Sequence, residues 1–171
     1  MRTSIKILLF CISSFVFIGC DRATKELAKE HLKNKEPISY LHNTVSLTYA
    51  ENTGAAMSFG DHLPKAASLV LLSFLPLLLL LTLFAYAVKH ANEFSNLKLF
   101  CISLIFAGGI GNVIDRIFFN RHVPDFMILS FHQLRTGIFN VADVCVTMGM
   151  IGLLIFYRDK KMERATQKTN V

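Results

Sequence analysis

The feature that most constrains this chain is a set of long apolar runs that carry no charge. Residues 66–88 hold no charged side chain and are rich in leucine, and residues 99–114 are also uncharged. A helix rises about 1.5 Å per residue, so about 20 residues cross a hydrocarbon core of about 30 Å. Two further apolar runs lie at 7–20 and 138–157. The sequence therefore predicts an integral membrane protein with spans at about 5–25, 66–88, 97–115 and 138–157.

The predicted fold is an all-α membrane protein, a single domain of residues 1–171 with four transmembrane helices. Two extramembrane segments, 33–65 and 116–137, separate the spans, and the first contains a short strand pattern followed by a turn. We therefore expect a small β element in the first segment and a mixed loop in the second. The net charge of +6 lies beside the apolar runs, where it favours contact with anionic lipid headgroups over binding to nucleic acid.

Four spans place both termini on one side of the membrane. Lys and Arg residues are denser beside the span ends on that side, so the positive-inside rule predicts both termini in the cytoplasm. The first segment leaves one alternative open, because its basic start, its apolar stretch and Gly19-Cys20 also resemble the signal peptide of an exported lipoprotein. Residues 21–32 continue the helical composition without Gly or Pro. We therefore expect one uninterrupted helix from Ile5 to about Leu32.

Ionisable side chains mark one end of the predicted spans. Such groups are costly at membrane depth, so each is a candidate functional residue. They lie at the end of the first span, at the end of the third, near the start of the fourth or in the loop that joins the last two. The four-span topology brings these stretches to one membrane face. The residues are Asp21, Lys25, Asp115, Arg116, Asp125 and Asp143.

The local spacing of polar residues adds detail to this cluster. Residues three or four apart share a face of a helix, and an Asn in such a position can hydrogen-bond a buried carboxyl group. The run GGIG at 108–111 is nearly free of side chains, so a neighbouring helix can approach it closely. The pairs with this spacing are Asp21 with Lys25, Asn112 with Asp115, and Asn140 with Asp143.

Two carboxyl groups held close together cannot both ionise, so one retains a proton near neutral pH. Such a pair can hydrolyse a peptide bond, because the ionised member takes a proton from water and the protonated member donates to the carbonyl oxygen. Motifs of other intramembrane proteases are missing. The sequence has no HExxH and no GxSG, and Asn112 follows the GIG of residues 109–111, where the GxGD motif of presenilin-type proteases needs Asp. A second hypothesis is a non-enzymatic transporter or assembly factor that uses the acids as an ion relay, although such sites more often lie near the membrane midplane.

Five short motifs occur in order from the first span to the last. Together they closely resemble the motifs of the bacterial lipoprotein signal peptidases, also called signal peptidase II. The resemblance covers the chain from the first span to the last. The motifs are DRATK at 21–25, NTGAAMS at 52–58, GGIGNVIDR at 108–116, VPDF at 123–126 and FNVAD at 139–143.

The resemblance implies an aspartic endopeptidase of the bacterial inner membrane that removes the signal peptide from diacylglyceryl-modified prolipoproteins, just before the lipidated cysteine. It implies Asp125 and Asp143 as the catalytic pair near the periplasmic face, with no cofactor and no metal ion. The implied fold has a periplasmic β-cradle and a short amphipathic helix, which suit residues 33–65. The implied partners are diacylated prolipoproteins and membrane lipids, and we expect a monomer. Residues implied to shape the site or hold the substrate are Asp21, Lys25, Asn52, Gly108, Asn112, Asp115, Arg116, Asn140 and Ala142.

Three positions depart from the pattern of that family. Arg22 stands where Gln is usual, Pro124 stands where Val is usual, and one extra residue separates Asp115 from Asp125. One added loop residue can move a side chain by about 3.5 Å, so the reach of Asp125 depends on how this loop folds. We expect Asp115 to be scaffold, held by Arg116 or by an amide. We also expect Lys25→Ala to weaken processing without unfolding the protein.

Overall fold

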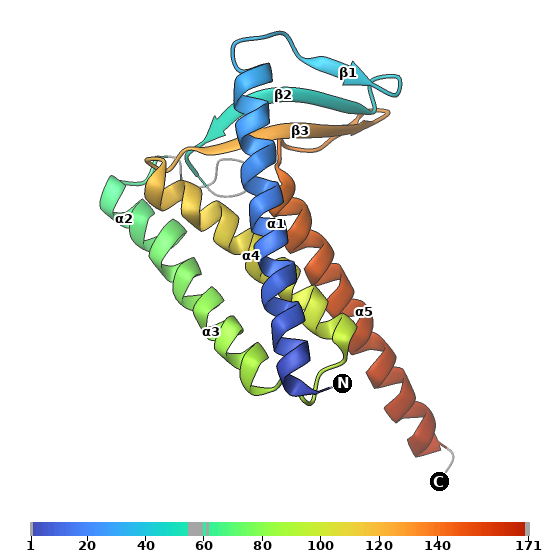
Figure 1. The fold of residues 1–171 in the computed structure, drawn as a ribbon. Coiled ribbons are helices and arrows are strands. Elements are labelled where there is room, and N and C mark those ends of the chain that lie inside the picture. The colour runs from blue at the N-terminus through green and yellow to red at the C-terminus, as the bar shows by residue number, and fades with distance from the viewer. Residues whose placement is uncertain (1, 55–59, 61, 170–171) are drawn as a thin grey trace.

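The computed structural model describes residues 2–54, 60 and 62–169. Figure 1 shows long helices that run beside one another and a β-sheet that lies across one end of them, with both chain ends at the opposite end. Residues 55–58 of the second motif lie outside the described residues. The short amphipathic helix expected in 33–65 falls partly on the same undescribed residues, and the described part of 33–64 contains no helix.

The helices agree with the predicted spans except at the start of the last one. α1 is one helix that continues through Gly19-Cys20, as expected. The predicted fourth span starts too early at residue 138, because Phe139 pairs with a strand and Asn140 caps the helix that follows. Among the described residues, three segments are long and apolar enough to cross a membrane, and a fourth apolar stretch is shorter. The three are α1 (Thr3–Leu32), Lys65–Lys89 and α4 (Asn96–Phe118), and the shorter stretch is Val141–Tyr157 of α5 (Val141–Thr169).

The segment Lys65–Lys89 changes helix type just before its proline. It comprises α2 (Lys65–Leu69), the π-helical turn η2 (Val70–Phe74) and α3 (Leu75–Lys89). Pro76 has no N–H to donate to the preceding turn, and its ring crowds the carbonyl four residues back. The wider turn accommodates this, since the Leu75 N–H donates to the Val70 carbonyl five residues back. The helix therefore continues past the proline, as π-type turns allow.

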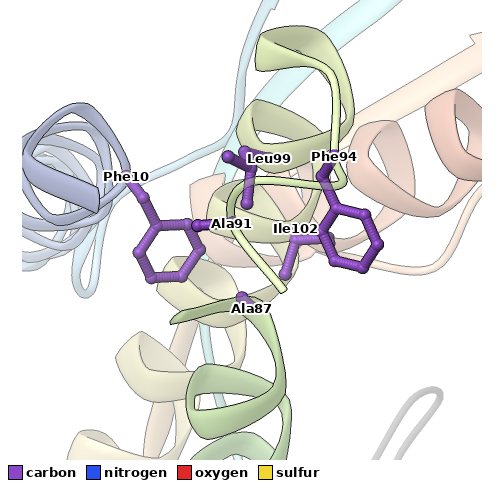
Figure 2. Packing of buried hydrophobic residues seen from close by; sticks show 6 residues of the cluster. All are labelled: Phe10, Ala87, Ala91, Phe94, Leu99 and Ile102. Carbon is purple, nitrogen blue, oxygen red and sulfur yellow. The ribbon is translucent and has the colours of Figure 1, made fainter. Parts of the chain in front are cut away.

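A compact apolar cluster joins the helices at the end opposite the sheet (Figure 2). Phe10 of α1 packs there against the end of α3, the loop that follows and the start of α4. The Lys6 ammonium donates to three carbonyls of that loop, those of Ala91, Asn92 and Phe94. These bonds fix the beginning of α1 to the α3–α4 connection. The buried members of the cluster are Phe10, Ala87, Ala91, Phe94, Leu99 and Ile102.

The sheet has four antiparallel strands in the order β1-β2-β3-β4. The strands are β1 (Ile38–Tyr40), β2 (Val45–Asn52), β3 (Val123–Phe131) and β4 (Leu134–Arg135). The sequence placed a β element only in 33–65, but half of the strands come from 116–137, where we expected a loop. The long β3 pairs with β2, with a register shift between Leu47 and Ala50. Asp125 consequently lies on a strand, which fixes its position more firmly than a loop would.

Candidate active site

The predicted polar residues form one buried network where the helices meet the sheet. Lys25, Asp115 and Asn140 have no measurable exposure, and Asp21 and Asp125 are also buried. These five side chains come from α1, α4, β3 and the residue before α5. Buried charges are stable only when they are paired and hydrogen-bonded, so the partners of each group decide what the network can do.

The Lys25 ammonium uses all three of its N–H donors within this network. It donates to Asp21 Oδ2 at 2.7 Å, to Asp115 Oδ2 at 2.6 Å and to Asn112 Oδ1 at 3.1 Å. The two residues that the spacing places on one face of α1 therefore form an ion pair, and two further contacts extend it to α4. Because an ammonium has three donors and no acceptor, the side chain is fully satisfied and ties the two helices together.

Asp115 has different partners from those that the sequence indicated. Its Oδ1 accepts a hydrogen bond from Arg22 and its Oδ2 accepts one from Lys25. Arg116 is not its counter-ion, because consecutive residues on a helix point in directions about 100° apart. The Arg116 guanidinium donates instead to the carbonyls of Gly54 and Asn112, at 2.8 and 3.2 Å.

Arg22, the first of the three positions expected to depart from the family pattern, is an integral part of the scaffold. Besides its ion pair with Asp115, its guanidinium lies 4.2 Å from the centre of the Phe119 ring. A planar guanidinium can pair with a carboxylate and stack on an aromatic face at the same time. The added charge beside Asp21 is thus balanced by Asp115, which the sequence alone did not reveal.

The start of α5 is held by a reciprocal cap that includes Asp143. The Asp143 N–H donates to Asn140 Oδ1, and Asp143 Oδ2 accepts from the Asn140 N–H, both at 3.1 Å. This is the arrangement of a capping box, with Asn and Asp in the two roles. The Ala142 N–H donates to Asp21 Oδ1 of α1 at 2.8 Å. Two of the otherwise unpaired N–H groups at the helix start are therefore satisfied, one of them by a different helix.

Two asparagines connect Asp143 to the rest of the network. Asn112 Nδ2 donates to Asp143 Oδ1 at 2.8 Å, while its Oδ1 faces Lys25. Asn140 Nδ2 donates to Asp125 Oδ1 at 2.6 Å, while its Oδ1 accepts from Asp143. In each side chain the amide oxygen accepts a hydrogen bond from an N–H group. This fixes the orientation of the amide, so that its nitrogen points to the other side and donates to a carboxylate. Asn140 therefore contacts both acids of the predicted pair.

The sheet brings Asp125 to this network despite the extra loop residue. Phe139 exchanges two backbone hydrogen bonds with Met127 of β3, each 2.9 Å long, directly before Asn140. Asn52 of β2 adds a side-chain hydrogen bond of 3.1 Å to Asp125 Oδ2. In the turn before β3, Asn120 and Arg121 both have positive φ. The pairing of β3 with β2 and with Phe139 therefore places Asp125 within the network.

Burial raises the pKa of Asp125 to about 6, from an ordinary value of 3.8. The hydrogen bonds from Asn52 and Asn140 act in the opposite direction, and the charge of Asp143 raises the pKa further. Burial and a nearby like charge both favour the neutral carboxyl group. Asp125 therefore keeps its proton to a higher pH than an ordinary aspartate does.

The predicted glycine patch allows three helices to approach α4. A Cβ on Gly108 would lie 2.2 Å from the Ala142 carbonyl oxygen, and one on Gly111 would lie 2.6 Å from Asp21 Oδ2. A Cβ on Gly109 would lie 2.6 Å from the Leu80 side chain of α3. Gly108 and Ala142 therefore set the contact between α4 and the first turn of α5, which carries Asp143.

A cleft of about 400 Å³ opens beside the two acids. Asn52, Asp125 and Asp143 supply its polar wall, and apolar side chains supply most of the rest. The apolar wall could not be identified from the sequence, because its residues come together only through the register of β3 and the start of α5. Its members include Leu129, Ile138, Phe139, Val144 and Met148.

Comparisons with known proteins show which family this chain resembles. The family model described as Signal peptidase (SPase) II matches residues 13–158. A "Lipoprotein signal peptidase" of Clostridium acetobutylicum is 34% identical over 151 residues, which cover 86% of this chain and 94% of the relative. Another, of Treponema denticola, is 35% identical over 148 residues, which cover 84% of each chain.

A solved structure shares the fold. It is a bacterial membrane enzyme determined by the in meso method at 2.3 Å resolution, with a TM-score of 0.76 and 24% identity. The match covers 90% of this chain and 89% of that one. From the extent of the family match and the identity to its members, this chain belongs to the signal peptidase II family.

Proposed function

We propose that this chain is an aspartic endopeptidase that removes signal peptides from diacylglyceryl-modified prolipoproteins, cutting just before the lipidated cysteine. The relatives that it resembles are named lipoprotein signal peptidases. The observation that carries the aspartic mechanism is the position of Asn140 beside one cleft, where its side chain donates to the Asp125 carboxylate and its backbone N–H donates to the Asp143 carboxylate. Two acids that share a neighbour and a cleft meet the geometric requirement for joint acid–base catalysis.

The two acids have different surroundings, which support different roles. Asp143 accepts hydrogen bonds from Asn112 and the Asn140 N–H in the first turn of α5, where the helix dipole also favours a negative charge. We assign it as the ionised base that takes a proton from the attacking water. Asp125, with its raised pKa, holds the proton that goes to the scissile carbonyl oxygen. Collapse of the tetrahedral intermediate then requires a proton on the leaving amine, which the same pair can return.

The pH dependence of kcat/KM tests this assignment. The reaction needs Asp125 protonated, and its pKa of about 6 means that the protonated fraction is lost as pH rises through about 6. We expect a descending limb centred near that pH in a profile measured with a diacylated peptide, because kcat/KM reports the free enzyme. The midpoint of this limb is a property of the two interacting acids together and not of Asp125 alone. An activity that stays constant well above this pH would assign the proton to another group.

The placement in the membrane is part of the proposal. The apolar part of α5 would complete a four-span bundle in the inner membrane, with both termini in the cytoplasm and the cleft near the periplasmic face. Figure 1 supports this, since the chain ends lie opposite the sheet. The proposal includes a monomer, since the described residues of one chain bring both acids to the same cleft. The comparisons do not favour the alternative of an ion relay in a transporter or assembly factor.

The dependence on substrate lipidation tests the function itself. Purified protein in detergent is incubated with a diacylated prolipoprotein and with the same precursor lacking the lipid. We expect cleavage of the diacylated form only, followed as a shift on a gel, because the cleft has an apolar wall beside the acids. Equal cleavage of both precursors, or of neither, would contradict the proposed substrate class.

A further inference from the structure

One end of the β-sheet extends sideways past the first turns of α5 (Figure 1). We call this end the sheet tip, residues 39–46 and 128–136. The β1–β2 turn and the β3–β4 turn both belong to it, and they lie together because the Ser130 N–H donates to the Thr44 carbonyl at 2.8 Å. The tip therefore projects from the helical bundle at the level where α5 begins.

The register of the strands gives the tip two different faces. Residues paired across strands share a face, and residues two apart along a strand also share one. Tyr40 pairs with Val45, which pairs with Leu129, and two residues further on Phe131 pairs with Leu134. These five apolar or aromatic residues consequently form one face. The other face carries Ser39, Ser46, Ser130 and Arg135, together with the buried Ile128.

The apolar face is the uncovered one. Leu134 is 76% exposed, Phe131 69%, Tyr40 52% and Leu129 45%. A half-covered antiparallel sheet in water normally places its apolar side chains on the protein side and its polar side chains outward. Here the most exposed side chains of the tip are apolar or aromatic, so they favour another apolar environment.

The surroundings of the tip identify that environment as lipid. Leu129 lines the same cleft as Val144 and Met148 of α5, and both are well exposed on the apolar stretch of that helix. The apolar face of the tip is therefore continuous with the side of a helix that faces acyl chains. The tip also contains Arg135, His42 and His132 and no acidic residue, which suits the anionic headgroups of a membrane surface.

We propose that the sheet tip inserts its apolar face into the adjacent lipid leaflet. The tip extends past the start of α5, and its Leu129 lines the cleft. Insertion of the tip would therefore keep the cleft at the boundary between acyl chains and headgroups. A lipidated peptide carries its acyl chains at this same depth. That consequence rests on the proposed function, whereas the insertion itself rests on the exposure, register and charge of the tip and on its continuity with the exposed apolar side of α5.

The chain contains no tryptophan, so one introduced indole reports its own surroundings. Leu134 and Arg135 are neighbours on β4, both exposed, and they point to opposite faces. Leu134→Trp and Arg135→Trp are reconstituted separately in vesicles of phosphatidylcholine and phosphatidylglycerol, with or without brominated acyl chains. We expect brominated lipid to quench Leu134→Trp several-fold more strongly than Arg135→Trp, and aqueous iodide to do the reverse. If a β4 variant fails to fold, Phe131→Trp and Ser130→Trp repeat the comparison on β3.

Three other results would each overturn the insertion. Equal quenching of both variants by iodide would leave the tip in water. Shielding of Leu134→Trp that disappears when the protein is diluted in lipid would mean that a second copy covers the face. Shielding that appears only after a diacylated substrate is added would mean that the acyl chains of the substrate occupy it. Because fluorescence needs no catalysis, failure of the proposed function leaves this readout intact.

Discussion

Asp143→Asn and Asp125→Asn are each expected to lower the cleavage rate by roughly 10²–10⁴-fold, the usual contribution of a general acid or base. Asparagine has the size of aspartate but cannot exchange a proton in this way. Each carboxylate accepts two hydrogen bonds from N–H groups, and an amide can accept only at its oxygen. Each variant therefore loses about one hydrogen bond, worth about 1 kcal/mol of stability, and remains folded. Cleavage rate and melting temperature in detergent are measured together.

Asp115→Asn is the matched control for these variants. It removes a third buried carboxylate of the same network, but one that contacts Lys25 and Arg22 and does not line the cleft. We expect its activity to follow the amount of folded protein. An active Asp125→Asn variant beside a folded but inactive Asp115→Asn variant would move the catalytic role from Asp125 to Asp115.

Lys25→Ala is expected to have the largest effect on stability. The sequence indicated a folded variant with weakened processing, but the complete burial of Lys25 changes that expectation. Removal of the ammonium leaves Asp21 and Asp115 buried without a counter-ion on this side. Loss of one partner from a buried ion pair typically costs about 3–5 kcal/mol. Chemical denaturation in mild detergent, with helicity as the signal, measures the change.

Lys29→Ala provides the comparison for that prediction. Lys29 lies one turn further along α1 and is exposed, so its removal should change the free energy of unfolding by less than about 0.5 kcal/mol. Lys25→Met combined with Asp21→Asn and Asp115→Asn should recover part of the lost stability, because no charge is then left buried without a partner. A stable Lys25→Ala variant would show that water reaches this network.

The sequence was sufficient to predict the helices and the convergence of the acids, because the patterns that indicate them lie within short stretches of the chain. An apolar run of about 20 residues allows few other structures, and the alternation of spans across the membrane then determines which ends meet. The spacing of Asn140 and Asp143 likewise indicated a shared face, which the structure shows as a reciprocal cap. Features of this kind depend on residues a few positions apart.

The features that sequence analysis missed depend on distant residues. β3 was read as a loop because Pro124 and Asp125 interrupt its apolar pattern, yet pairing with β2 makes it a strand. The partner of Asp115 was misassigned because Arg22 is far away in the chain and close only after α1 packs on α4. The apolar face of the sheet tip could likewise not be predicted, because the register between strands is not a property of any one segment.

The most direct test of the central claim is the mass of the products formed from one diacylated prolipoprotein. Wild type, Asp125→Asn and Asp143→Asn are compared at equal amounts of folded protein. The account predicts that wild type releases the intact signal peptide and a chain that begins with the lipidated cysteine, while both variants leave the precursor whole. A cut at any other position, or the same two products formed by either variant at the wild-type rate, would contradict it.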